Sequence, residues 1–245
     1  MIVSPLFYIN LLKKTRKCDI IMGDAEISVL FWRGFEMNID KIDEGIFRVL
    51  IPFEDDITTT VYIFVGADGV AVIDSATYPS DADDYIIPAL SSLGIALDSV
   101  KYILLTHSHG DHAGGAMRLL ELLPKAVIGS SFCKDEPRHL KLADGDVLLG
   151  RLQVVALPGH TLDSIAFFDI ETKTLMSGDC LQLYGVGKYR RGVGYRDLYR
   201  ESIDKLRRMD LVKIVAAHEY DPLGSLAEGK SSVEEYLDTS LKAIE

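Results

Sequence analysis

This 245-residue sequence is poor in cysteine, in histidine and in positive charge. Its three cysteines, Cys18, Cys133 and Cys180, form neither a CxxC metal pair nor a disulfide framework, and so sparse and odd a number is typical of the reducing cytosol. Lysine and arginine number 26 against 37 acidic residues, which gives a formal net charge of −11. Because phosphate groups are bound by clustered cations, this balance argues against a nucleic acid or an anionic membrane as the partner.

The N-terminal stretch MIVSPLFYINLLKKTRKC has an apolar run that is too short to span a bilayer. Its positive charges follow the apolar part, whereas a signal peptide carries them before it, so we expect no leader and a cytoplasmic protein. We expect residues 1–21 to be a poorly packed N-terminal extension. Residues 22–245 are predicted to form a single domain, because no linker, low-complexity run or fixed-period repeat divides them.

From about residue 44 the pattern alternates between strands and helices. Further strands are predicted in AVIGS, LQVVALPG, SIAFFDIETKTLMSGD and VKIVAAH. The clearest predicted elements are strands at 45–51 and 100–106, a hairpin at 60–74 turning at GADG, and helices at 81–94, 112–124, 195–209 and 231–244. Pro88 is expected to kink or shorten the first of these helices. Such a mixture predicts sheets that are covered by helices on their outer faces.

The chain concentrates three of its six histidines in LLTHSHGDHAGG, residues 104–115. Residues two apart in an extended segment point the same way, so His107 and His109 can reach one point at the end of a strand. A turn permitted by Gly110 can bring Asp111 and His112 to a second point nearby. Imidazole and carboxylate together suit a divalent first-row metal ion. The alternative is a cluster of solvated surface histidines, which would cost stability unless something bound them.

Other candidate ligands follow three further predicted strands. His160 follows LQVVALPG, Asp179 follows TLMSG, and His218 follows VKIVAA. Parallel strands gather such ends at one edge of a layered fold, where binding sites form. His139, in EPRHLK, falls outside this pattern, and we interpret it as a solvated loop residue.

Seven candidate ligands exceed what one ion needs, since such ions take three or four protein groups. The economical division gives one ion His107, His109 and His160, and the other ion Asp111, His112 and His218. Asp179 would bridge the two, because a carboxylate has two oxygens to share. The sequence therefore predicts two divalent ions, with zinc favoured and manganese or iron as alternatives.

Four separated motifs, HSHGDH, PGHT, SGD and AAHE, together resemble the metallo-β-lactamase fold superfamily over about residues 42–220. The resemblance implies an α/β fold, a four-layer αβ/βα sandwich with the metals between the inner sheet edges. It also implies the same division of ligands between the two ions. Asp74, which ends VAVID, matches a further position of the family, where an aspartate supports a ligand or the loop backbone; the alternative is a simple turn residue.

Positions at which this sequence departs from the family pattern indicate which branch of the superfamily it resembles. The true β-lactamases commonly have a cysteine where Asp179 stands, whereas aspartate is typical of glyoxalase-like and lactonase-like members. Cys180 is adjacent, and we expect it to face away from the ions and to pack. HEYD at 218–221 is similar to the HEYT of glyoxalase II, although 27 residues after His218 are too few for that enzyme's glutathione-binding helical domain. Flavodiiron members have a carboxylate where His109 stands, and nuclease branches fit poorly with the acidic charge.

These features predict a hydrolase that cleaves a small ester, thioester, lactone or lactam by attack of a metal-bound hydroxide, with Asp111 as a candidate proton shuttle. Two alternatives stay open. One is a mononuclear iron sulfur dioxygenase of the same superfamily, and the other is a metal-binding regulatory module without turnover, which is disfavoured because no predicted ligand is missing.

The small-molecule substrate is expected to meet the segment 179–196, which follows a ligand directly. Tyr220 could donate to an oxyanion. Candidates for binding a substrate carboxylate or thiol conjugate are Tyr184, Lys188, Tyr189, Arg190 and Arg191. The alternative is a solvated basic loop with aromatic packing. The sequence leaves the oligomeric state open.

Overall fold

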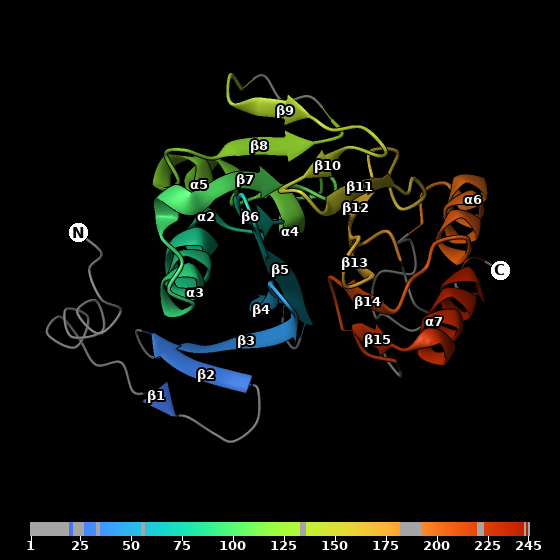
Figure 1. The fold of residues 1–245 in the computed structure, drawn as a ribbon, viewed down its shortest axis with the longest axis horizontal. Coiled ribbons are helices and arrows are strands. Elements are labelled where there is room, and N and C mark those ends of the chain that lie inside the picture. The colour runs from blue at the N-terminus through green and yellow to red at the C-terminus, as the bar shows by residue number, and fades with distance from the viewer. Residues whose placement is uncertain are drawn as a thin grey trace, which may run out of the picture.

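The computed structural model describes eight parts of the chain: 20–21, 27–32, 35–54, 57–132, 136–181, 193–219, 223–242 and 244. Their strands form two sheets (Figure 1). The first sheet has the order β1 (Ile20–Ile21), β2 (Ile27–Trp32), β3 (Phe35–Asp43), β4 (Ile46–Glu54), β5 (Ile57–Gly66), β6 (Gly69–Ile73), β7 (Val100–Leu104), β8 (Val127–Ser130) and β9 (His139–Lys141). The second has the order β10 (Val147–Leu148), β11 (Leu152–Ala156), β12 (Ile165–Asp169), β13 (Thr174–Gly178), β14 (Lys213–Ala216) and β15 (Leu226–Glu228).

Helices cover the outer face of each sheet, as the sequence predicts. The helical segments are α2 (Pro79–Asp81), the π-helical η1 (Ala82–Ile86), α3 (Ile87–Ser92), the 3-10 turn η2 (Leu97–Ser99), α4 (Gly110–Ala113), α5 (Ala116–Leu122), α6 (Arg196–Arg207) and α7 (Lys230–Lys242). Figure 1 shows α3 and α5 outside the first sheet and α6 and α7 outside the second. The arrangement is the four-layer αβ/βα sandwich that the sequence resemblance implies.

Three apolar cores hold the four layers together. One lies between the first sheet and its helices, with Ile63 and Leu119 among its members. Another lies between the second sheet and its helices and includes Tyr199. The central core joins the two sheets, where Phe64 of β5 and Phe167 of β12 are fully buried. Burial of apolar surface between layers is what stabilises such an architecture.

The predicted elements from residue 44 onward are confirmed, with shifted bounds. The predicted helix 81–94 is instead a continuous run of α2, η1 and α3, in which Pro88 lies near the start of α3, directly after the π-helical turn η1. The predicted helix 112–124 is divided into α4 and α5. Strands β1 to β3 precede the point at which we expected regular structure to begin.

The N-terminal extension is almost wholly outside the described residues. Ile20 and Ile21, at its predicted end, form β1 and pair with Leu30 and Val29 of β2. The boundary between extension and domain therefore stays a prediction. In the described part of the chain, no helix has the length and apolar character needed to cross a bilayer.

The strand directions bring several strand ends to one edge. β6 and β7 run parallel, and so do β13 and β14. β11 is antiparallel to β12, which is antiparallel to β13, so β11 points the same way as β13. The carboxyl ends of these strands carry the loops that contain the candidate ligands, which is where α/β sheets place their binding sites.

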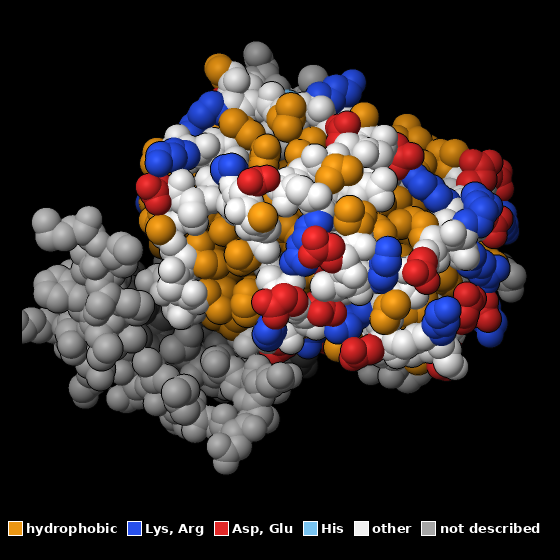
Figure 2. Space-filling model, in the orientation of Figure 1, with side chains coloured by type: hydrophobic (Ala, Val, Ile, Leu, Met, Phe, Trp, Pro, Cys, Tyr) orange, Lys and Arg blue, Asp and Glu red, His pale blue; other side chains and the backbone are white. Residues whose placement is uncertain are grey.

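Charged side chains of both signs lie next to one another over α6 and α7 (Figure 2). Two ion pairs account for part of this pattern. Arg207 of α6 pairs with Asp238 of α7, and Lys205 of α6 pairs with Asp144 at 2.6 Å. These pairs tie the outer helices to each other and to the second sheet.

A buried lysine joins the two sheets at the end opposite the candidate ligands. The Nζ of Lys213, in β14, donates to the carbonyl of Ile42 at 2.8 Å and to the carboxylate of Asp43 at 2.9 Å, and lies 3.2 Å from Glu228. Burial raises the pKa of Asp43, but the hydrogen bond and the positive charge of Lys213 outweigh it, and the pKa is lowered overall. Asp43 is therefore ionised in the folded protein at neutral pH.

We expect Lys213→Met to lower the free energy of unfolding by about 1–3 kcal/mol at pH 7, because Ile42 and Asp43 lose a charged donor. The lowered pKa of Asp43 means that its contribution is present above its unfolded pKa of about 3.9 and is lost as the pH falls through the folded value. Urea unfolding should therefore show a difference from wild type at pH 7 that shrinks below about pH 4. The exposed Lys125, paired with Asp98, offers the control Lys125→Met, which should change little. Equal effects of the two substitutions would contradict the role given to Lys213.

Candidate metal centre

The predicted ligands converge on one point between the two sheets. His107 lies in the loop after β7, Asp111 and His112 lie in α4, and Figure 1 shows α4 at the centre of the molecule. His160 follows β11, Asp179 follows β13 directly, and His218 follows β14. All seven residues fall into two groups, each with its potential ligand atoms within 4.8 Å of one another. We name these the His107 group (His107, His109 and His160) and the Asp111 group (Asp111, His112, Asp179 and His218).

The His107 group is the more open of the two. The Nδ1 of His109 lies 3.0 Å from the Nε2 of His160. The ring centroid of His107 is 4.6 Å from that of His109 and 4.8 Å from that of His160. His107 is buried, His160 half-buried and His109 exposed. The cluster is therefore reached from solvent on the side of His109.

Asp179 lies between the two groups, with one carboxylate oxygen toward each. Its Oδ2 is 3.5 Å from the Nε2 of His160. Its Oδ1 is 3.3 Å from the Nε2 of His218 and 3.5 Å from the Nε2 of His112. Asp111 directs its Oδ2 at the same two nitrogens, at 3.5 Å from each. Asp179 thus occupies the place that a bridging ligand requires.

Asp74 orients two of the histidines from a fully buried position. Its Oδ2 lies 2.8 Å from the Nδ1 of His112, so that nitrogen donates to the carboxylate and Nε2 is the atom left to face a metal ion. Its Oδ1 accepts from the N–H of Thr106 at 2.8 Å. The Thr106 hydroxyl donates to Asp74 and can then only accept from the Nδ1 of His107, at 3.1 Å. One carboxylate therefore sets the tautomer of His112 directly and that of His107 through a hydroxyl.

The electrostatic environment keeps the carboxylates ionised. Burial raises the pKa of Asp179, but the neighbouring His218 and His112 outweigh it and hold the pKa well below its usual range. The pKa of Asp111 is also lowered, because His218 and His112 overcome the effect of burial. Desolvation, with the positive charge of His112, lowers the pKa of His107 well below its usual value. The neutral imidazole is the form of histidine that can bind a metal ion.

His218 is oriented by the first sheet. Its Nδ1 lies 2.8 Å from the backbone carbonyl of Thr58 in β5, an acceptor only, so Nδ1 donates and Nε2 faces the two carboxylates. The next residue, Glu219, accepts from the hydroxyl of Ser225 at 2.5 Å and from its N–H at 3.1 Å. Arg48 of β4 in turn donates to the Ser225 hydroxyl at 2.7 Å. The loop that carries His218 is thereby fixed on both sides.

The loop geometry differs from prediction at one glycine. Gly110 has no positive φ and would have open space around a Cβ, so the chain reversal is made by the helical turn α4 and does not require glycine. Gly114 is required because its backbone lies close to that of Thr77: a Cβ at this position would be 1.9 Å from the carbonyl oxygen of Thr77. Gly178 has a φ of +52°, and a Cβ there would lie within 2.8 Å of the side chain of Thr106. The contact at Gly114 holds α4 against the loop after β6, and the contact at Gly178 brings the ligand loops of the two sheets together.

Two further sequence interpretations can be compared with the structure. Cys180 is buried in the core between the second sheet and its helices, as expected for a packing residue. His139 is not a solvated loop residue: it begins β9, is half-buried, and its Nε2 lies 2.7 Å from the Ser130 hydroxyl. No sequence pattern indicated that partner. Thr58 and Thr106 were also missed, because they act through contacts and not through a motif.

The predicted substrate-binding residues lie outside the described residues. They are Tyr184, Lys188, Tyr189, Arg190, Arg191 and Tyr220. Phe53 is an aromatic residue beside a candidate ligand, with its ring centroid 6.3 Å from that of His218. The role of the six residues stays a prediction.

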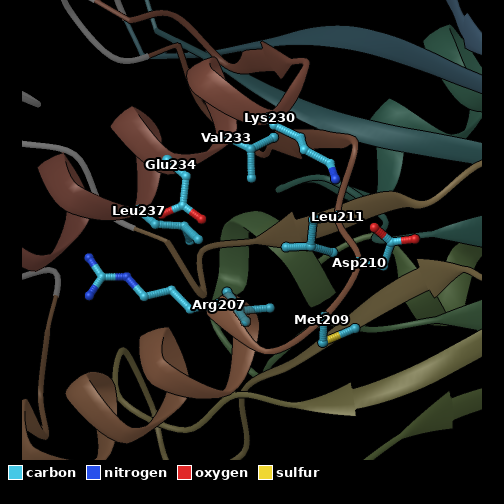
Figure 3. Close-up of a pocket in the computed structure, with 9 residues that line it drawn as sticks. Arg207, Met209, Asp210, Leu211, Lys230, Val233, Glu234 and Leu237 are labelled. Atoms are coloured by element: carbon cyan, nitrogen blue, oxygen red, sulfur yellow. The ribbon is translucent and has the colours of Figure 1, made fainter.

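A separate pocket of about 210 Å³ lies between the end of α6 and α7 (Figure 3). Leucine side chains and Val233 form its floor, while Arg207, Asp210, Lys230 and Glu234 stand around it. Its charges are of both signs, and none of the seven candidate ligands lines it. It is therefore not a candidate for the same chemistry.

The residues present fit a pair of divalent cations. Within the described residues, the Nε2 atoms of His107 and His112 are buried and make no hydrogen bond. Burying such atoms costs free energy unless a partner satisfies them. The Asp111 group adds two ionised carboxylates, which a cation would neutralise. The His107 group offers three nitrogen ligands, a common set for zinc.

Comparison with known proteins gives a family match and named relatives. The family model described as "Metallo-beta-lactamase superfamily" matches residues 55–218. A hydroxyacylglutathione hydrolase from Ectopseudomonas mendocina is 32% identical over 164 residues, 65% of this chain and 62% of the relative. Another from Pseudomonas putida KT2440 is 38% identical over 124 residues, 48% of this chain and 47% of the relative. The match thus spans about half to two thirds of the length of these relatives.

Solved structures agree on the fold. The metallo-beta-lactamase from Erythrobacter litoralis has a TM-score of 0.67 and 18% sequence identity, covering 91% of this chain and all of that one. At this identity the likeness concerns the fold alone.

Proposed function

Because the chain belongs to the metallo-beta-lactamase superfamily, we propose that it is a metal-dependent hydrolase with a dinuclear centre that cleaves a small ester, thioester, lactone or lactam. One observation carries the proposal. The His107 group and the Asp111 group lie side by side, and Asp179 turns one oxygen to each at 3.3–3.5 Å. Seven ligand-type side chains in this arrangement are more than one ion needs.

The His107 group would hold one ion and Asp111, His112 and His218 the other, with Asp179 shared. Bound together, two such ions supply a water molecule with a pKa of about 7 and polarise a carbonyl oxygen. Histidine and aspartate ligands suit zinc, which we propose as the native metal, with manganese or iron as alternatives.

Asp111 is the proton carrier in this proposal. Its lowered pKa leaves the carboxylate ionised at neutral pH, so the oxygen that does not face the ion could accept the proton released when water attacks the carbonyl. The same oxygen then returns the proton to the leaving sulfur or oxygen. Hydrolysis of a thioester would thus yield a carboxylate and a thiol.

Among the substrate classes, a thioester is the one that we favour. Both relatives named above are hydroxyacylglutathione hydrolases, and Asp179 stands where a cysteine is common in the β-lactamases. The substrate would approach over His109, the exposed ligand. Tyr184, Lys188, Tyr189, Arg190 and Tyr220 are proposed to contact its polar end.

The test is a joint measurement of metal content and turnover on the full chain. We expect elemental analysis to give two ions per chain, and we expect the protein to release thiol from a hydroxyacylglutathione faster than it opens lactones or β-lactams. Removal of the ions with a chelator should abolish turnover, and zinc should restore it. One iron per chain, with oxygen uptake in place of hydrolysis, would instead establish the sulfur dioxygenase alternative.

A further inference from the structure

Among the strands that the structure describes, none pairs with the first half of β5 on the side of β6. β6 pairs only with residues 62–66 of β5, from Tyr62↔Ile73 to Gly66↔Gly69. Residues 57–61 of β5 extend beyond the end of β6, because β6 ends at Ile73 and the chain turns away at Asp74. Backbone groups at such an edge need other partners.

The end of β14, from the other sheet, occupies this edge. The N–H of Thr60 donates to the carbonyl of Ala217 at 2.9 Å. The carbonyl of Thr58 accepts from the Nδ1 of His218, and Thr58 is paired across β4 with Pro52, which has no N–H to offer. The segment therefore orients His218 by backbone contacts that replace the missing strand.

The same segment also reaches the other ligand loop. Thr59 lies between these two residues, so its side chain points to the opposite face of the sheet. Its buried hydroxyl donates to the backbone carbonyl of Asp111 at 3.3 Å. Residues 58–60 thus contact both Asp111 and His218, which come from different sheets and are 107 positions apart in the sequence.

We propose that the Thr59 hydroxyl is a positioning group for Asp111, and that it acts together with two backbone groups that contact the loop of His218, the carbonyl of Thr58 and the N–H of Thr60. The side chain of Thr60 has no part in this role. This inference rests on the proposed dinuclear centre. Without the hydroxyl, the carbonyl of Asp111 loses its donor and the loop can shift relative to His218. Residues that orient metal ligands in this way typically change metal affinity 10–100-fold when lost.

The strand supplies a matched control. Thr59→Val removes the hydroxyl and keeps the shape of the side chain. Thr60→Val makes the same change at the next residue and serves as the control. Within the described residues, the Thr60 hydroxyl is buried and makes no hydrogen bond, so its removal breaks none. We expect Thr59→Val to weaken binding of one of the two ions by about tenfold and Thr60→Val to leave both affinities unchanged.

The experiment is a competitive titration of the apo-protein with Zn²⁺ and a chromophoric chelator, followed by a Co²⁺ absorption spectrum of each variant. Thr59→Ser, which keeps the hydroxyl, should restore both affinities. If Thr59→Val does not fold, Thr59→Ala against Thr59→Ser gives the same contrast, since the two differ only in the hydroxyl. Two wild-type affinities in a variant without the hydroxyl, or an equal loss in Thr60→Val, would overturn the inference. A wild-type protein that binds fewer than two ions would overturn the proposed function, and this inference with it.

Discussion

Asp179→Ala is expected to reduce the metal content from two ions to one or none and to lower kcat/KM by more than about 100-fold, the upper range for residues that only support a ligand. The reason is geometric. Asp179 has one oxygen toward each group, near His160 on one side and near His112 and His218 on the other. Elemental analysis and a thioester assay on the same preparation would measure both effects.

The adjacent residue offers a control for this experiment. Cys180 packs into the apolar core outside the second sheet, so Cys180→Ala should cost about 1 kcal/mol in stability and leave two ions bound. An Asp179→Ala protein with two ions and full turnover would show that Asp179 is not a shared ligand. Loss of metal in Cys180→Ala would mean that the residues after β13 face the site differently.

Asp74→Asn is expected to weaken the binding of one ion about 10–100-fold while the backbone stays in place, because asparagine also tolerates the positive φ of 63° at this position. If the amide NH₂ replaces Oδ2, it donates to the Nδ1 of His112, and the histidine proton moves to Nε2, the atom that would bind metal. If the amide is flipped, the NH₂ meets the N–H of Thr106, which has lost its acceptor. Either orientation costs binding or about 1–3 kcal/mol of stability. Zinc titration would measure the loss of metal binding expected for the first orientation, and urea unfolding would measure the loss of stability expected for the second.

A second buried aspartate in the same region provides the matched substitution. Asp81 accepts from the N–H groups of Thr77 and Tyr78 at 3.1 and 2.8 Å. The carbonyl oxygen of an asparagine can accept these bonds, so Asp81→Asn should keep wild-type zinc affinity. Unchanged affinity in Asp74→Asn would contradict the tautomer argument.

The candidate ligands could be predicted from the sequence because each follows an apolar strand. Strand ends of like direction meet at one edge, so His160, Asp179 and His218 could be assigned without knowing their contacts. The structure brings them close to the HSHGDH loop, with Asp179 among the ligand atoms of the Asp111 group. How the seven residues divide between two ions stays a prediction. The covering of the sheets by helices could also be predicted, from the mixture of strands and helices along the chain.

What the sequence could not predict are contacts between residues far apart in the chain. The Thr58 carbonyl is an ordinary strand group until His218, 160 positions away, lies against it. β9, β10 and β15 have two or three residues each and are defined by pairing, not by composition. The chain reversal at Gly110 looked like a glycine turn because glycine permits one, whereas a helical turn performs it.

The most direct test of the two-ion centre is anomalous X-ray diffraction from a crystal of the full chain, recorded on either side of the zinc absorption edge. We expect two peaks about 3.5–4 Å apart, one among His107, His109 and His160 and the other among Asp111, His112 and His218. Asp179 should lie between the peaks. A single peak, or a pair in which Asp179 contacts only one, would contradict the account.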